Sequence, residues 1–147
     1  REKNRRIKRG KMVLEKEMFS ALKSFFNSQN FEVYEEVRFF SKKIDIICIK
    51  KDSEEIIAVE MKVKKWKKAL QQSIINQLCA DKVYVAFWHE NIGAIKKCRD
   101  LFEKYGVGVL EVNSSIIPII PAKSSPYMYE KMSELIKRNL AKRGEFY

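Results

Sequence analysis

The sequence predicts an α/β domain in which helices flank a mixed sheet of about five strands. Three observations support this. Short β-branched runs bounded by polar residues are typical of strands. Two such runs, 44–49 and 56–63, are joined by a polar turn at 50–55, as expected for an antiparallel hairpin. The later segments alternate between strand-like and helix-like patterns, which favours parallel strands with helical crossovers.

Before the hairpin, an apolar stripe at helical spacing predicts a helix over 12–27, and alternation predicts a strand over 31–39. A second helix is expected over 66–80. Its buried arc is assigned to apolar residues, namely Leu70, Ile74, Ile75, Leu78 and Cys79.

The second half is expected to contain a strand over 82–88, a helix over 91–104 and a strand over 107–112. Gly106 is the expected C-cap of that helix. Residues 113–126 hold all three prolines and form a connector, in which 116–120 is either an edge strand or a packed loop. A last helix is expected from residue 127 to residue 142.

With 147 residues, the chain predicts a single domain with a real core. Residues 1–11 carry seven basic side chains and one acid, and we interpret them as a mobile basic arm. The core spans 12–112 and the connector 113–126. Residues 127–147, a basic C-terminal helix, belong to the same domain.

The net charge of +11 points to an anionic partner. Nucleic acid is the first choice and a membrane surface the second, while a solubility effect without a partner stays open. No apolar run approaches the roughly 20 residues of a membrane span, and no signal peptide is visible. The three cysteines are widely spaced and odd in number, which disfavours a disulfide framework or zinc site and favours a cytoplasmic setting.

Two carboxylates interrupt the apolar strands of the hairpin. If the turn centres on Asp52 and Ser53, antiparallel pairing places Asp45 opposite Glu60, with Cβ atoms about 5 Å apart. Lys62 shares the face of Glu60 because side chains alternate along a strand. Opposed carboxylates repel, and a divalent cation between them would remove the repulsion. Hard oxygen ligands suit Mg²⁺, with Mn²⁺ as a substitute.

The constellation Asp45, then Glu60-x-Lys62, resembles the PD-(D/E)xK nuclease superfamily, particularly its Holliday-junction resolvase-like branch. The order of predicted elements is also similar to that family, from about residue 15 to residue 112. This chain has Ile44 where the family often has proline. The resemblance implies a restriction endonuclease-like core and metal-dependent hydrolysis of DNA phosphodiester bonds.

By the same resemblance, Asp45, Glu60 and the Met61 carbonyl would bind the metal, and Lys62 would act on the attacking water and the phosphate. Glutamine in the following helix is also expected at the site. The spacing favours Gln72, at the edge of the apolar arc, over Gln71, inside it. An accessory acid is expected on the first helix at Glu17, with the alternatives Glu15 and Glu36 left open.

Basic residues directly after the hairpin are expected to contact phosphates, and an aromatic among them to stack on a base. They are Lys64, Lys65, Trp66, Lys67 and Lys68, together with Arg5, Arg6 and Arg9 of the arm. A core role for Trp66 is the alternative. No small-molecule cofactor is expected, and a homodimer stays open because cutting two strands requires two sites. The alternative function is a nuclease-like module that binds DNA or a protein without cleaving.

Overall fold

The computed structural model describes the backbone of residues 2–145 and the side chains of residues 14–145. Its middle layer is a sheet of six strands in the order β1-β2-β3-β4-β5-β6. The strands are β1 (Phe31–Phe39), β2 (Lys42–Lys50), β3 (Ile56–Lys62), β4 (Lys82–Trp88), β5 (Gly108–Val112) and β6 (Ile116–Ile120). The predicted α/β class is confirmed, with six strands where about five were expected.

The sheet is mixed, as predicted. β1, β2 and β3 pair in antiparallel fashion, β3, β4 and β5 pair in parallel, and β6 returns antiparallel to β5. The parallel pairs are those that a helical crossover connects. Segment 116–120, left open between an edge strand and a packed loop, is the edge strand β6.

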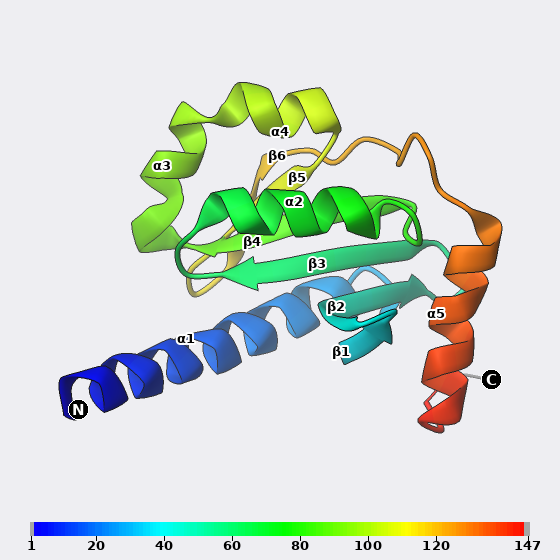
Figure 1. Cartoon of the computed structure of the whole chain (residues 1–147), viewed down its shortest axis with the longest axis horizontal. Coiled ribbons are helices and arrows are strands. Elements are labelled where there is room, and N and C mark those ends of the chain that lie inside the picture. The colour runs from blue at the N-terminus through cyan, green and yellow to red at the C-terminus, as the bar shows by residue number, and fades with distance from the viewer. Residues whose placement is uncertain (1, 146–147) are drawn as a thin grey trace.

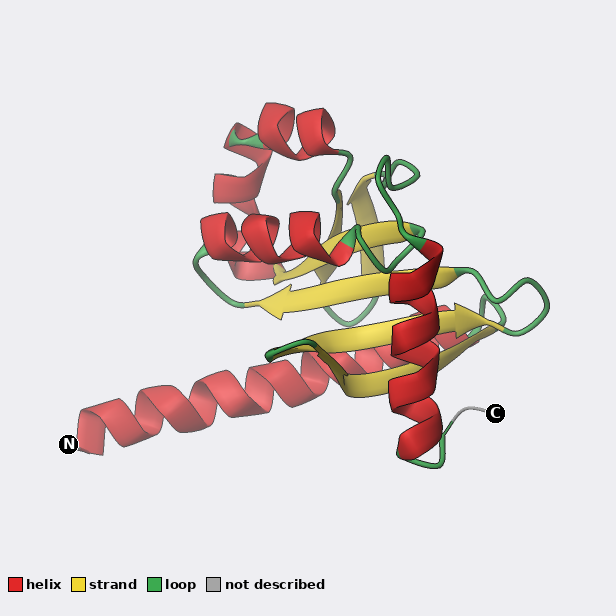
Figure 2. Cartoon of the chain, turned by 45° about the vertical axis from the view of Figure 1, so that its right-hand side comes forward, coloured by secondary structure: helices red, strands yellow, loops and turns green. Residues whose placement is uncertain are grey.

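Helices cover both faces of the sheet (Figures 1 and 2). α1 (Glu2–Asn27) lies on one face alone. The opposite face carries α2 (Trp66–Asn76), α3 (Ile92–Lys97), α4 (Arg99–Tyr105) and α5 (Glu130–Lys142). The core is therefore two clusters, one on each side of the sheet.

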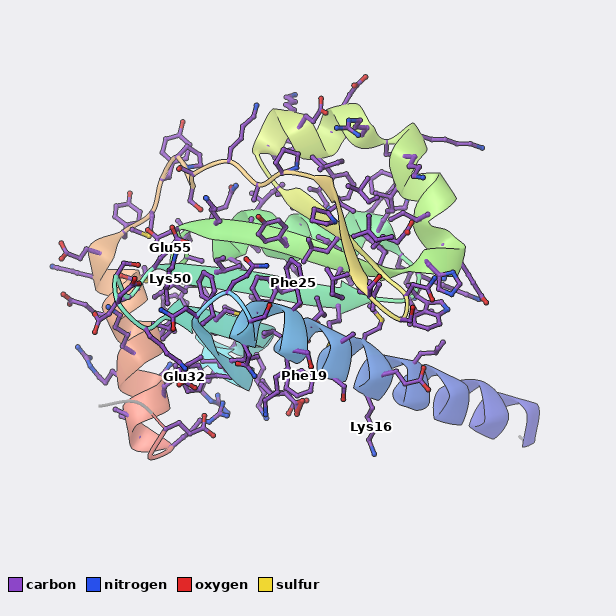
Figure 3. The ribbon with its side chains drawn as sticks, turned by 180° about the vertical axis from the view of Figure 1, so that it is seen from behind. Lys16, Phe19, Phe25, Glu32, Lys50 and Glu55 are labelled. Carbon is purple, nitrogen blue, oxygen red and sulfur yellow. The ribbon has the colours of Figure 1, made fainter. Side chains whose placement is uncertain are left out.

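α1 packs through Met18, Leu22 and Phe26, which recur every four residues and are at most 2% exposed. Lys16 on the same helix points away from the sheet (Figure 3). The helix begins at Glu2 rather than near residue 12, so the predicted mobile arm is helical. Its first turns extend beyond the sheet (Figure 1).

The helix expected over 91–104 is instead broken into three pieces: a 3₁₀ turn at His89–Asn91, then α3, then α4. The break between α3 and α4 is at Cys98, whose φ of −108° departs from helical geometry. Gly106 ends α4 with φ +72°, as the C-cap prediction requires. In the described part of the chain, no helix is both long and apolar enough to cross a membrane.

Candidate functional site

The β2–β3 ladder has the register that the sequence predicts. Ile46 lies opposite Val59 and Ile49 opposite Ile56, where the ladder ends; the same register continued by one step would place Asp45 opposite Glu60. On β3, Ile57 and Val59 belong to the apolar cluster under α1. Glu60 therefore points to the other face, toward α2. The hairpin brings the two predicted carboxylates together.

Asp45 lies where β2 changes its orientation. Ile44 packs in the cluster beneath α2 and α5, whereas Ile46 packs beneath α1, although residues two apart on a regular strand share a face. The Asp45 carboxylate accepts a hydrogen bond from the Met61 backbone N–H at 2.8 Å. A side chain thus replaces a backbone partner, and the two strands separate at the site.

Glu60 is buried, with 1% of its surface exposed. Its Oε1 accepts a hydrogen bond from Asn76 Nδ2 at 3.0 Å. Burial, together with the neighbouring Asp45 carboxylate, raises the pKa of Glu60 to about 7, while the Asn76 donor opposes that rise. The two carboxyl groups are close enough to share a proton. A cation between them would keep both ionised.

Two lysines accompany this pair. Lys62 lines the cleft together with Asp45 and Met61. Lys42, which the sequence interpretation overlooked, lies half-buried on β2, and its Nζ donates to the Gln72 backbone carbonyl at 3.4 Å. Burial lowers the pKa of Lys42, and the nearby charges of Glu60 and Asp45 oppose that effect.

The site opens into a cleft of about 540 Å³ between α1 and the ends of β1, β2 and β3. Asp45, Met61 and Lys62 line it. Of the three acids considered on the α1 side, Glu15 and Glu36 also line this cleft, whereas Glu17 lines a separate hollow beside Trp88. The structure does not bring Glu17 together with Asp45.

The buried side of α2 differs from the predicted arc. Ile75 is 48% exposed, while Ser73 and Asn76 are fully buried, so the arc rests on Ala69 and Leu70 and continues in polar residues. Gln71 is exposed, not inside the arc, and Gln72 is partly buried as expected. Side-chain oxygens on this polar face lack a hydrogen-bond partner within the described structure, namely Gln72 Oε1, Ser73 Oγ and Asn76 Oδ1.

The predicted basic cluster surrounds the start of α2. Lys64 and Lys65 are exposed and line a cavity of about 310 Å³ with Trp66. The Trp66 ring is 6.1 Å from the Phe102 ring, centroid to centroid, and packs against the core, which favours its core role. Two further exposed lysines, Lys67 and Lys68, begin the helix. The side chains of Arg5, Arg6 and Arg9 lie outside the described residues.

The donor set suits a hard divalent ion. Asp45 and Glu60 each keep one carboxylate oxygen beyond the hydrogen bonds to Met61 and Asn76. No group of three His, Cys, Asp or Glu side chains that could hold a metal occurs among the described residues. Mg²⁺ is commonly bound through one or two carboxylates, with water and substrate phosphate completing its shell, so two suffice.

The sequence contains features that could have identified two further residues of this site, Lys42 and Asn76. Lys42 lies three residues before Asp45 within the same strand, and a lysine there needs a reason as much as the acid does. Asn76 follows Gln72 by four residues, so both lie on one side of α2. Two amide side chains four residues apart, Gln72 and Asn76, therefore indicate a polar helix face that could cover the acid Glu60 on the preceding strand.

No family model and no curated protein matches this sequence. Among solved structures, the SPO1766 protein of unknown function from Silicibacter pomeroyi is similar over 86% of this chain and 83% of its own, with a TM-score of 0.68 at 12% identity.

Two other solved structures are less similar to this chain. SfsA from Pyrococcus furiosus, in complex with Ca²⁺, has a TM-score of 0.45 at 12% identity, covering 72% of this chain and 63% of its own. A repair endonuclease from Pyrococcus abyssi has a TM-score of 0.45 at 17% identity, covering 66% of this chain and 46% of its own. Identities this low leave the chemistry to be argued from the site itself.

Proposed function

We propose that this protein is a metal-dependent endonuclease that hydrolyses phosphodiester bonds in DNA, as the resemblance to the PD-(D/E)xK superfamily implies. One observation carries the proposal. The Asp45 carboxylate acts on the buried Glu60 where β2 and β3 separate, and Lys62 lines an open cleft together with Asp45. Acids this close are unfavourable in a resting fold unless a cation joins them.

Asp45 and Glu60 would hold Mg²⁺ through their free oxygens, with Met61 offering a backbone carbonyl. When bound, the ion supplies Lewis acidity at the phosphate. Lys62 lines the same cleft, and its ammonium group would orient the attacking water and offset the charge that develops on the phosphate oxygens. The water oxygen bonds to phosphorus as the bond to the leaving sugar oxygen breaks.

Substrate binding is supported by the charge of the chain and its distribution. The net charge is +11, and the lysines at the start of α2 follow Lys62 directly in the sequence. No acid lies in the first turn of α2, so cations there oppose the helix dipole, and bound phosphates would offset both. Such contacts hold a duplex without reading its sequence.

The test uses the full chain with supercoiled plasmid, in Mg²⁺ or Mn²⁺ and in EDTA. Wild type is expected to nick or cut only with metal. Glu60→Gln and Lys62→Met are expected to lose cleavage and still retard DNA in a gel, because the lysines near α2 remain. Unchanged cutting by both variants would contradict the site.

Matched controls lie at the opposite end of the same hairpin. Lys50 and Glu55 flank its turn (Figure 3), and the backbone N–H of Lys50 donates to the Glu55 carbonyl. Lys50→Met and Glu55→Gln should therefore cut like wild type. If wild type binds DNA but never cuts it with either metal, the alternative of a non-cleaving nuclease-like module takes its place.

A further inference from the structure

Lys42 is a cation on β2, the strand that carries Asp45. The Glu60-x-Lys62 motif lies on the neighbouring strand β3, so the motif does not include Lys42. Its Nζ donates to the Gln72 carbonyl, and the charges of Glu60 and Asp45 act on it. No ion pair within the described residues includes Lys42. The Lys42 ammonium is thus held at α2 one helical turn from Asn76, the donor to Glu60, and forms no ion pair with either acid.

The number of free oxygens limits what the pair can bind. Asp45 Oδ2 is engaged by the Met61 N–H, and Glu60 Oε1 by Asn76 Nδ2. One oxygen remains on each carboxylate beyond these two hydrogen bonds. Two such oxygens serve one divalent ion, whereas two adjacent ions would need further anionic ligands.

The anionic ligands that a second divalent ion would need do not occur around Lys42 among the described residues. No metal-binding group of three His, Cys, Asp or Glu side chains occurs in the part of the chain that the structure describes. Beneath Glu60, α2 offers the neutral side chains of Ser73 and Asn76, both fully buried. A second divalent ion there would meet an ammonium group in a poorly solvated region, where like charges repel strongly.

We propose that this site binds a single divalent cation and that the Lys42 ammonium supplies the second positive charge beside Asp45 and Glu60. The inference rests on the proposed nuclease function and makes Lys42 a positioning residue, which acts through the two carboxylates. Lys42 and Lys62 offset only part of the charge of the two acids before the ion arrives, because neither lysine forms an ion pair with them within the described residues. The incoming ion then balances the phosphodiester and the charge it gains during hydrolysis.

Metal binding measured without DNA tests this. The full chain is titrated with Mg²⁺ by calorimetry at about pH 8.5, above the pKa of about 7 of Glu60, so that this carboxyl group is ionised. Wild type is expected to bind one ion. Lys42→Met should still bind one, with a dissociation constant roughly fivefold lower, because a repelling charge in a poorly solvated region is gone, whereas an exposed charge is screened by solvent. A merely structural lysine would not tighten binding when removed.

Lys43→Met is the matched control. Lys43 is the next residue on β2, is exposed, and lines a different cavity, so its loss should leave Mg²⁺ affinity unchanged. Lys42→Arg keeps the charge and should resemble wild type. If circular dichroism shows that Lys42→Met does not fold, Lys42→Gln replaces it, because its amide keeps a donor for the Gln72 carbonyl.

Two ions per wild-type chain, or no ion, would overturn the inference. So would a folded Lys42→Met or Lys42→Gln that binds Mg²⁺ as weakly as wild type or more weakly. Plasmid cleavage is measured separately, and kcat of Lys42→Met should fall about tenfold with KM unchanged. If wild type cuts nothing, the nuclease proposal fails while the titration still decides the role of Lys42.

Discussion

The Asp45 carboxylate accepts the Met61 backbone N–H at 2.8 Å, across the point where β2 and β3 cease to pair. The Asp45 side chain therefore accepts the hydrogen bond that a backbone carbonyl of β2 would accept in a regular ladder. The same contact fixes the direction of the carboxylate and leaves its other oxygen free for a ligand. Asp45 thus has a structural and a chemical role, which substitutions can separate.

Asp45→Asn and Asp45→Ala both remove the charge, so both should abolish metal-dependent cleavage. Only Asp45→Asn keeps an oxygen for the Met61 N–H. Asp45→Ala leaves that donor unpaired and should be less stable than Asp45→Asn by about 1–3 kcal/mol. Urea denaturation of the two variants measures the difference, and equal stability would show that the hydrogen bond to Met61 contributes nothing.

Asn76→Ala removes the donor that favours the ionised form of Glu60. We expect a loss of about 1–3 kcal/mol in the free energy of unfolding, because a buried carboxylate oxygen loses its partner. The pKa of Glu60 should rise, since the Asn76 bond holds it down. Urea denaturation at about pH 8 tests the stability change.

The control is Ile75→Ala, one residue earlier on α2. Ile75 is 48% exposed, so its truncation should cost well under the loss expected at Asn76. If the two variants are equally stable, the Asn76–Glu60 bond has no energetic role.

Gly108 at the start of β5 tests the packing under the sheet. A Cβ there would lie 2.5 Å from the Tyr84 ring and 2.8 Å from the Ala122 backbone nitrogen, which are closer than real contacts allow. Gly108→Ala should therefore destabilise by about 1–3 kcal/mol. Gly93→Ala has nothing within 4 Å of the new Cβ and should be close to neutral. Thermal unfolding of both variants decides, and equal melting temperatures would contradict the steric argument.

The hairpin could be predicted because one local rule fixes it. Alternation has a period of two, so centring the turn on Asp52 and Ser53 determines every opposite pair, including Asp45 with Glu60. What the sequence did not reveal is that β2 changes face at Asp45. That depends on a side chain capturing the Met61 N–H, which alternation does not encode.

The second helix shows the opposite case. Its buried arc was inferred from apolar residues such as Ile75, but α2 turns that residue to solvent and buries Asn76. The reason is the acid on β3: a helix that covers Glu60 needs a donor at that spot more than another methyl group. Likewise, the basic character of residues 1–11 indicates a mobile arm because charge reports on partners, while the backbone of residues 2–11 is helical.

Glu60 also makes stability depend on pH in the metal-free protein. Its pKa is about 7 in the folded chain against an ordinary value of 4.5, so the folded state binds more protons between those values. The free energy of unfolding should therefore fall as pH rises from about 4.5 to about 7 and level off above. Urea denaturation in EDTA across this range measures the slope, and Mg²⁺ should restore stability at the upper end.

Glu60→Gln should remove most of that slope, because an amide does not titrate. Glu134 on α5 is exposed and forms no ion pair with any residue that the structure describes, so the profile of Glu134→Gln should follow wild type. A wild-type protein whose stability rises steadily from pH 4.5 to pH 7 in EDTA would mean that Glu60 is ionised at no cost. The pair would then lack the unfavourable charge that a cation is proposed to relieve.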